Sequence, residues 1–169
     1  MKKVSTRKTY NEQLNDPAKK TKYFDIEKDT PQYVAKWGKT GILPSPVEIN
    51  DIMKEVPVGF LVTADAIKCC LAQKHGVDSV CPVTFGIYAN LCAKASVERE
   101  DKDFPYWRMI KENGELCEKF PCGVDGQRRL LELEGHRITQ KGKKFFVEDY
   151  EKRLWNGGAI DNCGDSLYN

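Results

Sequence analysis

The segment from Phe104 to Ile110 constrains the fold of this chain more than any other, because two large aromatic residues and an arginine follow a proline there. Proline fixes its own φ and pushes the preceding residue toward an extended conformation. Asn113-Gly114 comes next, and Asn-Gly between apolar runs is the strongest short-range signal for a β-hairpin. The sequence therefore predicts a strand over 104–110, a turn at Asn113-Gly114 and a second strand.

A pair of helices precedes this segment. Thr63 is a capping residue for the first helix, and Gly76 is positioned to end it. Pro82 opens the second helix after a short link. Apolar residues recur along one expected stripe of the second helix: Val83, Ile87, Leu91 and Ala95. Two helices joined by a tight turn and followed by a hairpin are typical of a winged helix-turn-helix.

Other elements complete an α+β pattern. Residues 45–48 combine a capping serine, a proline at the first helical position and a glutamate three residues after the cap, which predicts a helix start. Residues 23–26 predict a short strand, and residues 124–134 predict a further helix. Residues 136–150 predict a second hairpin with a basic tip at 141–144.

The length of 169 residues fits one domain. Residues 1–22 are rich in Lys, Thr, Asn and Gln with few apolar positions, so we expect a flexible basic arm. Residues 23–155 are expected to form the single domain. The last segment, 156–169, is rich in Gly, Asn and Asp and is expected to be a disordered tail.

Composition narrows the function classes. No apolar run approaches the ~20 residues that span a bilayer, and the basic N-terminus lacks the apolar segment of a secretory signal. A cytoplasmic protein with no membrane role is therefore expected. The seven cysteines include no C-x-x-C pair, which predicts reduced thiols, no zinc site and no cofactor. The net charge of +2 gives no global attraction to nucleic acid, so DNA binding requires a local basic face.

Glu134 stands out on the expected helix over 124–134. It shares a face with Gln127, Leu130 and Leu131, which places its carboxylate on the apolar side. A charge placed there needs a partner. Two interpretations remain open: a carboxylate at the edge of the core, paired with an arginine or a backbone amide, or a catalytic carboxylate.

Several motifs follow one another in a specific order: Val56-Pro57-Val58-Gly59, the helix pair from Thr63 to Ala95, Pro105-Tyr106-Trp107-Arg108-Met109-Ile110, Asn113-Gly114 and Leu130-Leu131-Glu132-Leu133-Glu134-Gly135. This order resembles the C-terminal domain of O6-alkylguanine-DNA alkyltransferases and the alkyltransferase-like proteins derived from them. The similarity covers about half of the chain. It implies a winged helix-turn-helix-like alkyltransferase domain with small β-hairpins, to which this chain adds an N-terminal extension.

In that family a Pro-Cys-His-Arg motif supplies the thiolate that takes the alkyl group from a flipped guanine, and the histidine relays charge to a glutamate that precedes a glycine. Here Tyr106 and Trp107 stand at the cysteine and histidine positions, while Pro105, Arg108 and Glu134 match. A tyrosine hydroxyl, with an ordinary pKa of about 10, cannot replace the thiol. The resemblance therefore implies a protein that is not an enzyme. The alkyltransferase-like proteins also lack that cysteine, and they bind alkylated DNA without repairing it.

The resemblance also assigns residues to two surfaces. The lesion pocket would be formed by Tyr106, Trp107, Arg108, Glu134, Phe120 and Cys122. The DNA-binding residues would be Cys81, Lys68, Lys74, Lys94 and Arg99, together with the basic hairpin tip. The expected partner is double-stranded, alkylated DNA, bound by a monomer, and a protein of a repair pathway is a second candidate partner.

Two departures from the family concern base flipping. The arginine that fills the gap left by the flipped base has its place here near Cys81-Pro82, and the tyrosine that assists rotation of the nucleotide corresponds to Ala64. Extruding a base costs a few kcal/mol, which the residue that fills the stack partly offsets. Flipping would therefore have to proceed without an arginine wedge.

Alternative interpretations of these residues remain open. Both aromatics could be core residues, and since neighbouring residues of a strand face opposite sides, only Tyr106 is expected to face a pocket. An enzyme or redox sensor could use Cys81, at a helix start, or Cys122, in the turn that forms the pocket wall. A protein-interaction module would result if an extension from Lys22 to Glu55 covered the DNA-binding face.

Overall fold

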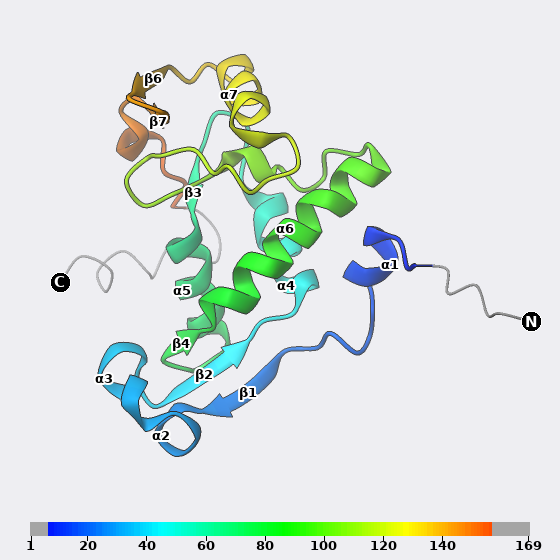
Figure 1. The fold of residues 1–169 in the computed structure, drawn as a ribbon, viewed down its shortest axis with the longest axis vertical. Helices are drawn as coiled ribbons and strands as arrows, with labels where there is room; N and C mark the ends of the chain where they lie inside the picture. Colours follow the sequence, from blue (N-terminus) through cyan, green and yellow to red (C-terminus); the bar gives the residue numbers. More distant parts are fainter. Residues whose placement is uncertain (1–6, 157–169) are drawn as a thin grey trace, which may run out of the picture.

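A computed structural model describes residues 7–156 of the chain. Residues 1–6 of the expected arm and 157–169 of the expected tail lie outside this part. The described residues form a mixture of helices and small sheets, with the long helix α6 crossing the middle of the molecule (Figure 1). None of their helices has the length and apolar character needed to cross a membrane.

Within the N-terminal third of the chain, residues 22–43 form one end of the molecule (Figure 1). The elements of this third in chain order are α1 (Tyr10–Leu14), β1 (Lys22–Asp25), α2 (Ile26–Asp29), η1 (Pro31–Tyr33), α3 (Val34–Trp37), β2 (Thr40–Leu43) and α4 (Pro46–Glu55). Strand β1 runs antiparallel to β2, with Tyr23 opposite Ile42. Strand β4 (Ser79–Val80) pairs parallel with the other edge of β2. The N-terminal segment is thus joined by a three-stranded sheet to the chain between the helix pair.

In the rest of the chain, residues 123–147 lie at the opposite end of the molecule, and residues 62–99 connect the two ends (Figure 1). The elements of this part are β3 (Val62–Thr63), α5 (Ala64–His75), β4, α6 (Pro82–Arg99), η2 (Tyr106–Arg108), β5 (Met109–Ile110), α7 (Gly123–Leu133), β6 (Ile138–Lys141), β7 (Lys144–Val147) and η3 (Tyr150–Arg153). Strands β6 and β7 form the hairpin expected at the basic tip. Buried residues of both ends belong to one hydrophobic core.

Local signals set the helix boundaries where the sequence predicts them. The Glu48 N–H donates to Ser45 Oγ over 3.3 Å at the start of α4, and the Ala66 N–H donates to Thr63 Oγ1 over 3.2 Å at the start of α5. Gly76 ends α5 in a left-handed conformation, with φ of 62°. Each capping bond satisfies an N–H group that has no partner inside its helix.

Helix α1 lies in the segment that was expected to be a flexible arm. Thr9 caps it, and Glu12 returns a hydrogen bond to the Thr9 N–H over 2.8 Å, which forms a capping box. Leu14 is buried in the hydrophobic core. Residues 10–14 therefore pack against α6 and do not form a free arm.

The strand and hairpin expected from Phe104 onward are wrong. Residues 106–108 form the 3₁₀ turn η2, and only Met109 and Ile110 are in a strand. That strand pairs in parallel with β3 and not with a strand after Asn113-Gly114. The Asn-Gly pair does make a tight turn, in which the Lys111 N–H donates to the Glu115 carbonyl over 2.9 Å.

Gln127 explains why no partner strand is needed at this place. Its fully buried amide donates to the carbonyls of Trp107 and Met109, over 3.1 and 2.8 Å. Its side-chain oxygen accepts from the Cys117 N–H over 2.7 Å. A helix side chain thus satisfies backbone groups that a hairpin ladder would otherwise satisfy.

The stripe predicted on α6 does not form one buried face. Val83 and Ile87 are 68% and 61% exposed, whereas Leu91 and Ala95 are buried. A step of four residues advances about 40° around a helix with 3.6 residues per turn, so three steps rotate by roughly 120°. The apolar row therefore turns from solvent into the core.

Two glycines should respond in opposite ways to alanine. A Cβ at Gly86, inside α6, would meet nothing within 4 Å, so Gly86→Ala should stabilise the fold by about 0.5–1 kcal/mol through helix propensity. A Cβ at Gly114 would lie 2.5 Å from Tyr150 Cδ1 at a φ of +80°, so Gly114→Ala should destabilise the fold by more than about 1 kcal/mol. Urea unfolding measures both. Equal effects of the two changes would contradict this packing.

Candidate functional site

The 3₁₀ turn η2 places both aromatic residues on one hollow. Tyr106 and Trp107 are each 6% exposed, and their rings meet edge to face with centroids 5.3 Å apart. Phe120 lies 5.5 Å from Tyr106 on another side. Successive side chains are about 120° apart in a 3₁₀ turn and about 180° apart in a strand. The expectation that Tyr106 alone faces a pocket is therefore corrected.

A pocket of about 240 Å³ opens beside these two aromatics. Its lining residues are Ser96, Val97, Glu100, Lys102, Tyr106, Trp107 and Leu130. Glu100 and Lys102 form its rim and have left-handed backbone conformations, with φ of 58° and 53°. Such conformations cost of order 1 kcal/mol for residues other than glycine and persist only where surrounding contacts hold them.

Glu134 lies behind the aromatics and is fully engaged by donors. Its carboxylate accepts from Trp107 Nε1 over 2.8 Å, from Arg108 Nη2 over 2.7 Å and from the Gly59 N–H over 3.2 Å. Burial alone would raise the pKa of Glu134, but the hydrogen bonds from Arg108, Trp107 and Gly59 outweigh it and lower the pKa. The structure thus contains the carboxylate paired with an arginine and a backbone amide, the first of the two interpretations.

Arg108 is positioned by the same cluster. Its Nη1 atom donates to the Val56 carbonyl over 2.6 Å, and its Nε and Nη2 atoms face Glu134. The guanidinium is buried and its donors point away from the pocket toward these acceptors. Arg108 therefore supports the Trp107 side of the pocket and does not line it.

Cys122 is near Tyr106, but no base activates it. The pKa of Tyr106 is raised, first by burial of its hydroxyl and then by the neighbouring Cys122 thiol. Neither histidine is placed beside this thiol: His75 contacts Tyr23 and Glu48, and His136 is buried near the charges of Glu134, Arg153 and Arg108. A thiol with no adjacent imidazole has no partner to take its proton.

The residues expected to bind DNA lie farther apart in the structure than the aromatic residues of the pocket. Lys68 forms an ion pair with Asp65, and Lys74 pairs with Glu48 over 2.9 Å. These lysines lie on α5, whereas the remaining expected cations lie on the C-terminal half of α6. The cations therefore do not form one free basic face.

Helix α1 covers both α6 cations. Lys94 Nζ lies 5.4 Å from the centroid of the Tyr10 ring. Arg99 pairs with Asp101 and donates to Asn11 Oδ1 over 2.9 Å. Cys81 precedes Pro82 as the N-cap of α6, and its thiol accepts a weak hydrogen bond from Thr84.

Two of the three lysines at the basic hairpin tip contact other side chains of the protein. Lys144 pairs with Glu115 over 3.0 Å, and Lys141 lies over the Phe146 ring. Lys143 is exposed at the tip. No group of three or more His, Cys, Asp or Glu side chains in residues 7–156 could hold a metal ion.

Sequence reasoning missed the rim of the pocket. Ser96, Glu100 and Lys102 carry no local signal of a site, because their positions depend on how α6 ends and how the chain turns back to Phe104. The role of Gln127 could have been predicted, because the sequence places it on the apolar face of its helix. A buried amide there needs hydrogen-bond partners.

Comparisons with known proteins find similar solved structures at low sequence identity. No protein-family model and no curated protein matches this chain. It is similar to the crystal structure of S. pombe Atl1 in complex with damaged DNA containing O6-carboxymethylguanine, at 21% identity and a TM-score of 0.47. It is also similar to S. pombe ATL in complex with DNA, at 21% identity and a TM-score of 0.46. Each comparison covers 66% of this chain and 94% of the other.

Replacing the buried carboxylate should be costly. Glu134→Gln leaves the Arg108 guanidinium buried without its counter-charge, so we expect a loss of about 3 kcal/mol in unfolding free energy. Glu132→Gln, on the same helix, breaks an exposed pair with Arg128 and should cost less than about 1 kcal/mol. Urea denaturation of both variants tests this, and equal losses would contradict it.

Stability should fall in mild acid through His136. Its buried imidazole has an Nε2 atom with no partner among residues 7–156, and burial lowers its pKa below the ordinary 6.5, with Arg153 and Arg108 adding to the shift against the opposing effect of Glu134. The unfolded chain therefore takes up a proton first as the pH falls below 6.5. The stabilisation is complete above that pH and is lost between it and the lowered pKa.

Urea unfolding between pH 5 and 7.5 measures this loss, and His136→Phe removes the group that titrates. We expect the variant to lose less stability over this range than the unsubstituted chain, because it has no buried imidazole at this position. Parallel pH dependences would show that His136 has the same pKa in the folded and unfolded chains.

Proposed function

We propose that this protein binds DNA without catalysing a reaction and holds an extrahelical, O6-alkylated guanine against Tyr106 and Trp107. The observation that supports this most directly is the pocket of about 240 Å³ with two adjacent aromatic rings on its wall. Stacking of a base on an aromatic side chain contributes roughly 1–3 kcal/mol. That is comparable to the few kcal/mol that extruding a base costs.

The same residues argue against alkyl transfer. The Trp107 indole is a donor only, and its N–H is already committed to Glu134, so it cannot act as a base. The raised pKa of Tyr106 keeps its hydroxyl protonated at neutral pH. An alkylated base would therefore be bound and released unchanged.

The surface around the pocket supports a winged-helix mode of DNA binding. Helices α5 and α6 would form the helix-turn-helix, and the β6–β7 hairpin with Lys141 and Lys143 would form the wing. The first turns of α6 expose Val83 and Ile87, and they follow Cys81-Pro82, near which the resemblance places the family's arginine wedge. Apolar residues at such places can enter the minor groove and separate base pairs.

A second function is favoured by the same exposed residues. Val83 and Ile87 are uncovered in the described part of the chain, while Lys68, Lys94 and Arg99 are engaged within the protein. Exposed apolar residues with few free cations also suit a protein partner, such as a component of a repair pathway. The expected covering segment from Lys22 to Glu55 packs α4 on the buried side of α6, where Cys92 Sγ donates to the Pro46 carbonyl.

Fluorescence anisotropy should separate these functions. A short duplex with one O6-methylguanine should bind more tightly than the unmodified duplex, and Tyr106→Ala should weaken lesion binding by about tenfold through lost stacking. Tyr106→Phe is the matched control, because it keeps the ring and removes only the hydroxyl contact with Cys122. It should retain lesion preference.

Circular dichroism of both variants would exclude unfolding as the cause. Equal binding of both duplexes by the unsubstituted protein would leave a general DNA-binding protein. No binding at low salt would refute the proposal and favour the protein-interaction function.

A further inference from the structure

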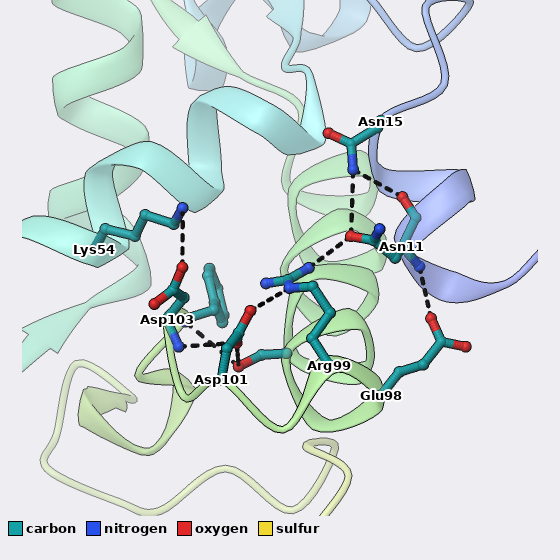
Figure 2. A network of polar contacts seen from close by, with 9 residues as sticks. Asn11, Asn15, Lys54, Glu98, Arg99, Asp101 and Asp103 are labelled. Carbon is teal, nitrogen blue, oxygen red and sulfur yellow. Dashed lines mark hydrogen bonds and ion pairs between the residues drawn. The ribbon is translucent and has the colours of Figure 1, made fainter.

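Helix α1 is fixed to the end of α6 by side chains from both helices. The Tyr10 and Asn11 N–H groups donate to the Glu98 carboxylate over 3.3 and 2.9 Å. In the opposite direction, Arg99 Nη1 donates to Asn11 Oδ1 over 2.9 Å. Figure 2 shows Asn11 between Glu98 and Arg99, with one polar contact to each. Hydrogen bonds thus run in both directions, because α1 donates to Glu98 and accepts from Arg99. Together they fix the position of α1 on α6.

The contacts continue from Arg99 into the rim of the pocket. Arg99 Nε pairs with Asp101, whose Oδ1 atom accepts from Ser96 Oγ over 3.2 Å and from the Asp103 N–H over 3.0 Å. Partial burial alone would raise the pKa of Asp101, but Arg99 and the other donors lower it. Lys54, on α4, pairs with Asp103 over 3.5 Å on the outer side (Figure 2).

This network holds a loop that would not keep its shape alone. Glu100 and Lys102, on either side of Asp101, have left-handed conformations that cost of order 1 kcal/mol each. Both residues line the pocket beside Tyr106 and Trp107, as does Ser96. The strained rim therefore depends on Asp101, and Asp101 is paired with Arg99.

We propose that helix α1 and Arg99 act as a brace that keeps the rim of the Tyr106–Trp107 pocket in its base-accepting shape. Arg99 is then a positioning residue, and not a phosphate contact as its sequence position predicts. The role in base binding rests on the proposed function. The bracing of the rim does not, because it concerns the free protein.

Two variants weaken the brace from different sides. Asn11→Ala removes the α1 acceptor without a change of charge, and Arg99→Ala removes the residue that joins α1 to Asp101. Gln13→Ala is the control for the first, since it also removes a side-chain amide from α1, and this amide donates to the Lys8 carbonyl. Lys8→Ala is the control for the second, because it also removes one positive charge and its partner is Asp16, not α6.

Two measurements on the free protein report on the rim. In a Trp37→Phe, Trp155→Phe background, Trp107 is the remaining tryptophan of three, and its quenching by acrylamide should increase about twofold in both brace variants. Trypsin cleavage after Lys102, compared with cleavage after the exposed Lys143 in the same digest, should increase as well. Destabilisation of the whole fold would instead increase the rates of cleavage after Lys102 and after Lys143 by the same factor.

Anisotropy with the O6-methylguanine duplex at several salt concentrations tests the link to base binding. Both brace variants should lose affinity by about tenfold with an unchanged salt dependence, since neither loss involves a phosphate. If only Arg99→Ala lost affinity for the duplex, and its binding depended less steeply on salt, Arg99 would be a phosphate contact and the proposed brace would be wrong. Unchanged quenching and unchanged cleavage in both variants would also overturn it. Altered quenching in a protein that does not bind the lesion would uphold the brace and refute the proposed function.

Discussion

The carboxylate of Glu134 is the group on which the rest of this structure depends. A buried charge is tolerated only when donors surround it, and here the donors come from Gly59, Trp107 and Arg108. These residues belong to the loop after α4 and to η2, so one side chain joins both to the end of α7. The buried amide of Gln127 adds two bonds from α7 to the backbone of Trp107 and Met109, so the carboxylate and this amide together fix η2.

The same cluster explains the 3₁₀ turn. Trp107 and Arg108 are neighbours in the chain, and both donate to one carboxylate. Neighbouring residues of a strand point to opposite faces, so an extended segment could not satisfy Glu134 from both. A tight turn can, and it brings Tyr106 onto the same hollow as Trp107. The shape of the pocket therefore follows from the pairing of a charge behind it. Side chains held in this way would need little rearrangement if a base entered the pocket. Less conformational entropy would then be lost on binding.

Local signals were sufficient for much of the fold. Ser45, Thr63 and Gly76 determine helix ends through bonds and conformations within a few residues, so the sequence predicts them. The parallel pairing of β3 with β5, and the use of Gln127 in place of a partner strand, join residues far apart in the chain. No short-range pattern contains that information, and the Asn-Gly turn was consequently assigned to a hairpin that does not form.

The residues of the candidate site also differ in how well the sequence predicts them. The order of motifs was enough to select Tyr106, Trp107 and Glu134, and the structure places them together. Lysine or arginine at a DNA-facing position is a weaker guide, because a charge is available to phosphate only when no internal partner holds it.

That availability decides what kind of DNA binding this surface can support. Each cation that neutralises a phosphate releases a counterion, and this release makes binding dependent on salt. Lys74 and Arg99 must first leave Glu48 and Asp101, so part of any gain is offset by the pairs that break. The first turns of α6 meanwhile present Val83 and Ile87. Under the proposed function, affinity for DNA would therefore come more from apolar contact and base stacking than from phosphate contacts, and a pocket of fixed shape would contribute most where electrostatic attraction is weak.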